Sequence, residues 1–228
     1  MNRETIRSRF RSENPEITER VISDSVLNGW MEDGDKDICA ITKCLKSNVP
    51  ETFSSVVDLQ YYDLTAQISK FYDIDEYPGG GVWYDDDPLE KATEAEMNYI
   101  MRNWKDASSG TPKRYFRRGQ YIWFDVAPDT ADLDIAISTV YISDDFDSDG
   151  KTPYNQLSYL EPFHVGILKY LQWKTKQKVG KDQESAKAEQ EYYTFAKRMK
   201  KLTSGSHNDK AFFKVRSNSG YSRINARR

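Results

Sequence analysis

The chain has 228 residues, and its 33 Lys and Arg against 36 Asp and Glu leave a net charge of −3. Hydrophobic residues make up only 38%, yet 15 Tyr, 10 Phe and 5 Trp are too many for a disordered chain. This length suits one large domain or two small ones, and a domain of this size folds without a disulfide or a metal. No run of roughly eighteen apolar residues occurs and no apolar stretch lies near the start, so membrane-spanning and secreted classes are not expected.

Charge is strongly segregated along the chain. Residues 58–149 carry 20 acidic and 8 basic side chains, a net charge of −12. Residues 197–228 carry 1 acidic and 10 basic side chains, a net charge of +9. A basic tail on an acidic body suits either nucleic acid or an acidic surface on a neighbouring copy.

Cysteine and histidine are scarce. Cys39 and Cys44 lie in an expected helix, where this spacing points their side chains in different directions, so we expect reduced, partly buried thiols. His164 and His207 are the 2 histidines, and neither shares a paired spacing with a cysteine. A zinc site is therefore not expected.

The first fifty residues are expected to be helical. Asn14 and Pro15 have the chemistry of an N-cap and a first helical position, and Asp35 that of the cap of a second helix that ends before Pro50. The apolar positions of the first helix are Ile17, Val21, Ile22, Val26, Leu27 and Trp30, and those of the second are Ile38, Ile41 and Leu45.

From Glu51 the apolar period changes to two, which predicts short antiparallel strands. Turn residues separate them at 77–81, 110–112 and 118–120. The clearest strands are 115–116, 121–124 and 133–142, with a turn at 117–120 between the first two. Residues 88–104 lack strand alternation and are expected to form a short helix inside this region.

The helical period returns from Leu157 to Leu171, and Val179 with Gly180 provides a stop. A last helix is expected from near Asp182, with apolar positions reaching Met199. The simplest way to bury both sets of helices is against each other. The sequence thus predicts an α+β protein: a helical bundle of residues 1–50 and 155–202, an inserted antiparallel β domain of residues 51–154, and an extended basic C-terminal tail of residues 203–228.

Acidic motifs raise the question of a metal site. Asp145, Asp147, Asp149 and Gly150 match the opening of an EF-hand loop, but Gln156 stands where calcium requires a bidentate Glu. A solvated acidic loop is therefore expected. The run Asp85 to Asp87 is likewise interpreted as a solvated loop, since no nucleotide motif lies near it.

Other motifs are weaker. Gly79 to Gly81 lacks the residues of a phosphate-binding loop and is interpreted as a turn. His164 lies on an apolar stripe and is expected in the core with one hydrogen bond, because no nucleophile signature accompanies it. The cluster Lys113 to Arg118 mixes cations with aromatics, which suits a nucleic-acid backbone or, equally, a hairpin tip that contacts an acidic neighbour.

The order of these pieces resembles a known family. The matching segments are Tyr62-Asp63-Leu64, Gly110-Thr111-Pro112 followed by Tyr115, Tyr121-Ile122-Trp123-Phe124, Ala127-Pro128-Asp129, Pro153 to Leu157 and Tyr170-Leu171. Together with the last helix and its basic tail, they resemble the head-to-tail adaptor (connector) proteins of tailed bacteriophages over residues 3–201.

The resemblance implies a structural protein of the virion, located in the neck between capsid and tail and assembled in the host cytoplasm. It implies a ring, commonly of twelve copies, that joins the portal protein to tail or neck proteins and continues the DNA channel without sequence-specific DNA binding or membrane contact. It implies no catalytic activity, cofactor or metal. The C-terminal tail is expected to be disordered alone and to bind the portal, and its expected partner-binding residues are Lys210, Phe212, Phe213, Lys214, Arg216, Tyr221, Arg223, Arg227 and Arg228.

The longer acidic β insertion departs from the family pattern and leaves the tail-side partner open. Acidic walls would keep a DNA channel from trapping phosphates, which is one hypothesis for this insertion.

Two alternatives remain. One is a nucleic-acid-binding module that acts through the basic tail. The other, an enzyme that uses the Asp-rich loops, is disfavoured because no nucleophile or metal constellation accompanies them.

Overall fold

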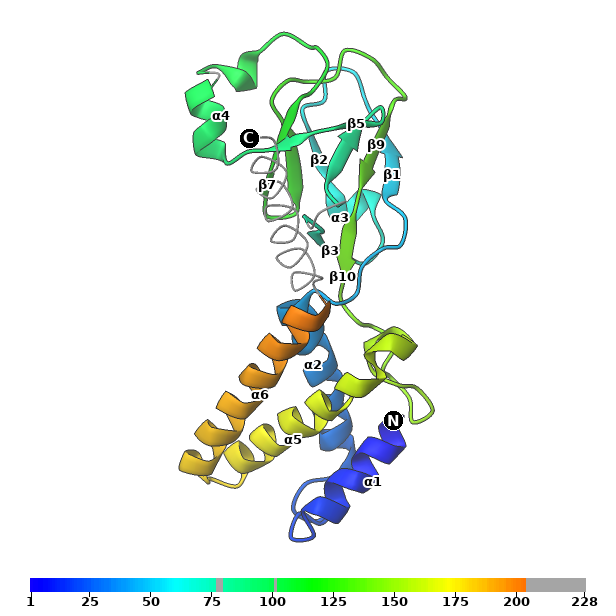
Figure 1. Cartoon of the computed structure of the whole chain (residues 1–228), viewed down its shortest axis with the longest axis vertical. Coiled ribbons are helices and arrows are strands. Elements are labelled where there is room, and N and C mark those ends of the chain that lie inside the picture. The colour runs from blue at the N-terminus through cyan, green and yellow to red at the C-terminus, as the bar shows by residue number, and fades with distance from the viewer. Residues whose placement is uncertain (77–79, 101, 204–228) are drawn as a thin grey trace, which may run out of the picture. The chain divides into compact units, whose positions relative to one another are not determined.

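The computed structural model describes residues 1–76, 80–100 and 102–203. The chain divides into two compact units (Figure 1). The helical unit comprises residues 1–45 and the described residues from Ser143 onward, and the β unit comprises Lys46–Ile142. The boundaries fall after Leu45 and Ile142, whereas the sequence had suggested residues 50 and 154. Helices together with antiparallel and mixed sheets confirm the α+β class.

The helical unit is built from α1 (Arg3–Glu13), α2 (Asp24–Thr42), α5 (Val165–Lys178) and α6 (Asp182–Thr203). α5 and α6 run side by side, and α2 packs against both (Figure 1). Their buried side chains form the core, which includes Leu27, Met31, Ile38, Ile167, Leu171, Tyr192, Ala196 and Met199. No described helix is both long and apolar enough to cross a lipid bilayer.

Two glycines let α2 and α5 approach closely. A Cβ added to Gly34 of α2 would lie 2.8 Å from Cδ1 of Tyr170 on α5. A Cβ added to Gly166 of α5 would lie 2.6 Å from Cδ1 of Ile38 and from Cε1 of Phe195. The absence of a side chain at these positions thus sets the distance between the helices.

The expected helix boundaries in the first fifty residues are wrong. Asn14 is the C-cap of α1, where its Nδ2 donates to the Phe10 carbonyl oxygen at 2.8 Å, so no helix begins there. Ser23 is the N-cap of α2, and its hydroxyl accepts from the N–H of Val26. Asp35 is buried inside α2 and does not begin a helix, because α2 runs unbroken from Asp24 to Thr42.

Both expected C-terminal helices are found, but the first begins at Val165 and not near Leu157. Two 3-10 segments, η2 (Tyr154–Gln156) and η3 (Ser158–Phe163), precede α5. Val179 is the C-cap of α5, and Gly180 takes a φ of +73°, which a glycine adopts without strain. α6 then begins at the expected Asp182.

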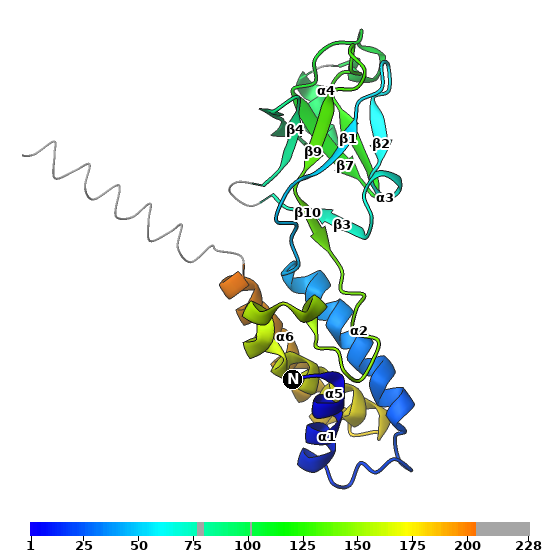
Figure 2. The ribbon, with the colours of Figure 1, turned by 90° about the vertical axis from the view of Figure 1, so that its right-hand side faces the viewer.

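The described part of the β unit forms two four-stranded sheets, β1-β9-β4-β5 and β2-β8-β7-β6, and the two-stranded pair β10-β3. The pairings are antiparallel except β6 with β7. Figure 2 shows β1 and β9 side by side. The bounds are β1 Glu51–Ser54, β2 Tyr61–Asp63, β3 Phe71–Ile74, β4 Val82–Tyr84, β5 Asp87–Pro88, β6 Glu90–Lys91, β7 Arg114–Arg118, β8 Tyr121–Phe124, β9 Asp134–Ile137 and β10 Thr139–Tyr141, with helices α3 Leu64–Gln67, α4 Glu94–Ile100 and η1 Trp104–Asp106.

One core lies between the two four-stranded sheets. Phe53 of β1 and Tyr62 of β2 pack across it with ring centroids 5.4 Å apart, and Phe124 of β8 lies 5.7 Å from Tyr62. Buried Ile135 and Ile137 of β9 line the same core. Alternate residues of β4, β8 and β9 are buried, as the period of two predicts.

Most of the expected strands are found. β7 and β8 form the predicted hairpin, and Gly119 in its turn takes a φ of +63°. The expected strand 133–142 is instead split at Ser138 into β9 and β10, which join different sheets. The expected short helix within 88–104 is α4, although strand β6 precedes it.

Candidate interaction surfaces

The residues expected to bind a partner, from Lys210 to Arg228, lie in segment 204–228, outside the described residues. The structure therefore leaves that prediction untested. It does describe α6, the helix from which this segment continues.

The last two turns of α6 are strongly basic. Lys197, Arg198, Lys200 and Lys201 are exposed, and none makes an ion pair within the described ranges. Cations at a helix C-terminus are stabilised by the helix dipole. Beside them lies a groove of about 440 Å³, lined by Lys169, Gln190, Glu191, Thr194, Phe195 and Arg198. The basic surface of the chain thus begins within the folded helix.

The carboxylates of the expected acidic loop make contacts within the protein. Asp149 accepts two hydrogen bonds from the Arg7 guanidinium of α1, at 3.0 and 2.9 Å. Asp145 pairs with Lys151 and accepts a hydrogen bond from Gln156, the residue that replaces the calcium-binding Glu. The contact between Arg7 and Asp149 joins the loop to α1.

In the run Asp85 to Asp87, the first two residues connect β4 to β5, and Asp87 begins β5. Asp85 and Asp86 take φ values of +49° and +67°, so the run makes a tight turn, and its side chains are exposed. Within the described ranges, no three His, Cys, Asp or Glu side chains gather in a group that would hold a metal ion.

Two cations of the Lys113 to Arg118 cluster are engaged in the fold. Arg114 pairs with Glu90 at 3.0 Å, and Arg117 pairs with Asp73 and lies over the Phe71 ring. Arg118 is the more open, with a side chain 71% exposed and a distant Glu94 at 4.0 Å. The cluster therefore does not present its cations as one continuous strip.

His164 is buried, as expected, and its Nδ1 lies 2.7 Å from the Met1 amino nitrogen. Burial is the main reason why its pKa is lowered to about 4, so the ring is neutral at physiological pH. Nε2 is buried and has no hydrogen-bond partner within the described residues. His164 is therefore a neutral histidine of the core.

The two cysteines do not point apart. Their Sγ atoms lie 4.0 Å apart, and both thiols are free and buried. Lys43 takes a left-handed conformation with a φ of +54° and ends α2, which turns Cys44 back toward Cys39. The sequence analysis assumed that both cysteines lie in one helix, but α2 ends at Thr42, before Cys44. Burial raises the pKa of the Cys39 thiol.

One surface was missed by the sequence analysis: a row of aromatic side chains on the outer face of β2 and β8. Tyr61 stacks on Trp123 with ring centroids 4.6 Å apart, and Tyr121 lies 6.0 Å from Tyr61. The alternation of 121 and 123 was visible in the sequence. The pairing of Tyr61 with Trp123 depends on strand register, which no local pattern revealed.

Comparison with known proteins agrees with the resemblance seen in the sequence. No curated protein matches the chain. The sequence model of one family, described as SU10 adaptor protein, matches residues 1–218, which include both units. This match confirms the resemblance to phage head-to-tail adaptors. The chain therefore belongs to the SU10 adaptor protein family, a family of structural adaptors of the bacteriophage virion.

Proposed function

We propose that the protein forms a ring in the neck of the virion, commonly of twelve copies, that joins the portal to the tail and continues the DNA channel. The family match over residues 1–218 is the observation that carries this proposal. Assembly takes place in the host cytoplasm, and the adaptor performs no chemistry. DNA passes through the ring without sequence-specific contacts.

The proposed architecture is a helical bundle with an inserted β domain. The order of the units along the chain supports this architecture, because the chain leaves the helical unit after Leu45 and returns to it at Ser143. The buried contact between Asp35 of α2 and Tyr154 joins the two halves of that unit. Such an insertion lets a bundle and a β domain serve different neighbours in one assembly.

The basic end of α6 and the tail that follows it form the proposed portal-binding element. Exposed cations of α6 without described ion pairs are available to an acidic neighbour, and the tail continues the same charge. Aromatic side chains in the tail supply apolar anchors, which offset the chain entropy that a docking segment loses. Docking by strand addition and docking in a helix groove are both compatible with this composition.

The test is the mass of the assembly, measured on the full chain alone and with the portal protein of the same phage. A closed ring is expected. A variant that stops after Thr203 keeps all of α6 and is expected to remain folded with unchanged thermal stability, but to lose portal attachment. Normal attachment by this variant would show that the tail is misassigned.

Two full-length variants separate charge from apolar contact. One replaces Phe212, Phe213 and Tyr221 with Ser and keeps every cation of the tail. The other replaces Arg223, Arg227 and Arg228 with Gln and keeps every aromatic. Weaker attachment of the first at all salt concentrations, and of the second mainly at low salt, is the expected pattern.

A nucleic-acid-binding module is the second candidate, favoured by the basic tail and by the exposed cations at the end of α6, which make no ion pair with the residues that the structure describes. Binding of this kind weakens steeply with salt, because phosphate contacts release counterions. Salt-dependent DNA binding that disappears with the truncation after Thr203, together with no portal attachment, would favour it. Metal-dependent turnover abolished by Asp147→Ala would instead indicate an enzyme.

A further inference from the structure

The outer face of the sheet β2-β8-β7 is only partly covered. Phe116 and Trp123 point outward there, opposite the core, and Met97 of α4 and Trp104 of η1 pack on them. Trp104 meets the rings of Phe116 and Trp123 edge-on, at 5.3 and 5.9 Å. Figure 1 shows α4 on the far side of β7 from β1 and β9. The side chains of α4 and η1 thus cover the outer face as far as Trp123.

Beyond Trp123 the aromatic row continues without cover. Tyr61 and Tyr121 remain 44% and 38% exposed, although both stand on strands that are buried on their other side. Tyr and Trp are the side chains most enriched in the energetic centres of protein interfaces. A rigid sheet also presents them at little cost in conformational entropy.

The carboxylate of Asp63 borders this open face. Asp63 is the cross-strand partner of Tyr121, and hydrogen bonds from Thr65 and Gln120 help to lower its pKa, so it is ionised. In the described part of the chain it makes no ion pair. The open face is thus aromatic in the middle and anionic at this edge.

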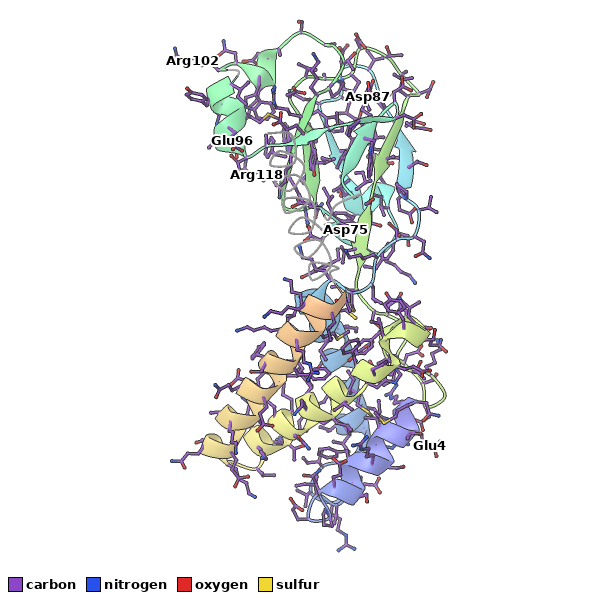
Figure 3. The ribbon with its side chains drawn as sticks, viewed as in Figure 1. Glu4, Asp75, Asp87, Glu96, Arg102 and Arg118 are labelled. Atoms are coloured by element: carbon purple, nitrogen blue, oxygen red, sulfur yellow. The ribbon has the colours of Figure 1, made fainter. Side chains whose placement is uncertain are left out.

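α4 carries the complementary features. Tyr99 is 92% exposed and Ile100 is 52% exposed, so two large apolar side chains stand next to each other in the sequence with much of their surface open. Arg102, which follows them, is exposed and has no ion pair among the described residues. Figure 3 labels Glu96 and Arg102 toward opposite ends of α4.

Hydrogen bonds at both ends hold α4 in place. Trp104 Nε1 donates to Asn98 Oδ1 at 2.9 Å, and the N–H of Thr93 donates to Glu96 while the N–H of Glu96 donates to the Thr93 hydroxyl. This reciprocal pair is a capping box, which fixes the start of α4. Tyr99 and Ile100 are therefore held outward by a structured element.

We propose that α4 of one copy docks on the open aromatic face of the next copy, with Tyr99 and Ile100 on Tyr61 and Tyr121. Arg102 of the first copy then meets Asp63 of the second, and neither side chain makes an ion pair within the described residues of its own copy. In this arrangement each copy gives α4 to one neighbour and its aromatic face to another, so the contact is heterologous, and repeating it generates a closed ring or a filament. The inference rests on the proposed ring and names the surfaces through which its β units associate.

A mixing experiment tests this contact on the full chain. One variant, Tyr99→Ser with Ile100→Ser, lacks the helix anchors but keeps the face. The other, Tyr61→Ser with Tyr121→Ser, lacks the face but keeps the anchors. Val56→Ser with Val57→Ser is the matched control, because it removes an exposed apolar pair elsewhere in the β unit.

Association is measured by sedimentation or mass photometry, under the conditions in which the wild-type protein forms its ring. Each of the first two variants alone is expected to associate at least about tenfold more weakly than the wild type. The control is expected to assemble normally. A mixture of the two defective variants should form a one-to-one dimer, because it retains a single intact contact.

Arg102→Glu provides a second test that does not alter the sheet, since this side chain has no described partner. It should weaken assembly more at low salt than at high salt. This variant keeps the inference testable if Tyr61→Ser with Tyr121→Ser fails to fold.

Several outcomes would overturn the contact. Normal ring formation by both aromatic variants would contradict the proposal. Folded variants that remain monomeric when mixed would also contradict it, because that result indicates that each surface pairs with its own counterpart on the next copy. Normal assembly of the face variant with loss of a different virion protein would assign the face to that protein. If the wild-type chain forms no ring, alone or with the portal, the proposed function itself fails, and this contact fails with it.

Discussion

The backbone N–H of Tyr154 donates a 2.9 Å hydrogen bond to Oδ1 of Asp35, and both residues are almost completely buried. Asp35 lies in α2, whereas Tyr154 belongs to the segment that returns from the β unit. Burial raises the pKa of Asp35 to about 6, although hydrogen bonds from Ser143 and Tyr154 act in the opposite direction. At neutral pH the helical unit therefore contains a buried carboxylate held mainly by hydrogen bonds.

The first prediction concerns Asp35→Asn. The folded protein binds a proton at Asp35 near pH 6, but the unfolded chain does so only near its ordinary value of 3.8. The carboxyl group therefore costs stability at pH 7, and this cost disappears as the pH falls from about 6 toward 4. Asn is neutral and keeps the acceptor for Tyr154, so the variant is expected to be more stable at pH 7 by on the order of 1–2 kcal/mol.

Urea unfolding at pH 7 and pH 4.5 measures this difference. The advantage of Asp35→Asn over the wild type should shrink at the lower pH. Asp35→Ala is the control, since it removes the acceptor and should destabilise by about 1–3 kcal/mol. A variant Asp35→Asn that is less stable than the wild type at pH 7 would contradict the interpretation of a costly buried charge.

The second prediction has the opposite sign and concerns His164. Its pKa is about 4 in the folded protein and 6.5 ordinarily, so the unfolded chain binds the proton first as the pH falls. Above about pH 6.5 the ring is neutral in both states and contributes nothing, while between 6.5 and 4 it lowers stability. NMR titration of the imidazole, assigned with His164→Gln, should give a pKa well below 6. A value near 6.5 would show that the ring is hydrated.

The third prediction compares two glycines of α2. Gly34→Ala is expected to destabilise by about 1–3 kcal/mol, because its Cβ would meet the Tyr170 ring at 2.8 Å and would also come within 3.2 Å of Tyr170 Cβ. Gly29 lies on the same helix with nothing within 4 Å of an added Cβ. Gly29→Ala should therefore stabilise by about 0.5–1 kcal/mol through helix propensity. Equal effects of the two variants in thermal unfolding would refute close packing at Gly34.

The sequence predicted those elements whose signals are local. Alternation and Gly119 were enough for the β7–β8 hairpin, and Gly180 marked the stop after α5. The boundary between α1 and α2 was wrong because Asn14 has the chemistry of either cap. Its hydrogen bond to the Phe10 carbonyl oxygen, rather than any feature downstream, makes it a C-cap.

Features that depend on contacts between distant segments were not predictable. The conformation of Lys43, which brings Cys44 to Cys39, has no clear signature in the sequence. The aromatic face needs Tyr61 beside Trp123, and that register results from the packing of the whole sheet. The expected portal-binding residues stay a prediction, since they lie beyond Thr203.

The last prediction concerns calcium and the loop from Asp145 to Gly150. Lys151 already pairs with Asp145 and Asp147, and Arg7 holds Asp149 with two hydrogen bonds. A cation would have to displace both side chains, and Gln156 supplies no charge in return. Calorimetry with calcium is expected to show no dissociation constant below about 1 mM. Arg7→Ala releases Asp149 but adds no ligand, so it should loosen the loop from α1 without creating a site. Micromolar binding by the wild-type chain would require a rearranged loop and would contradict these ion pairs.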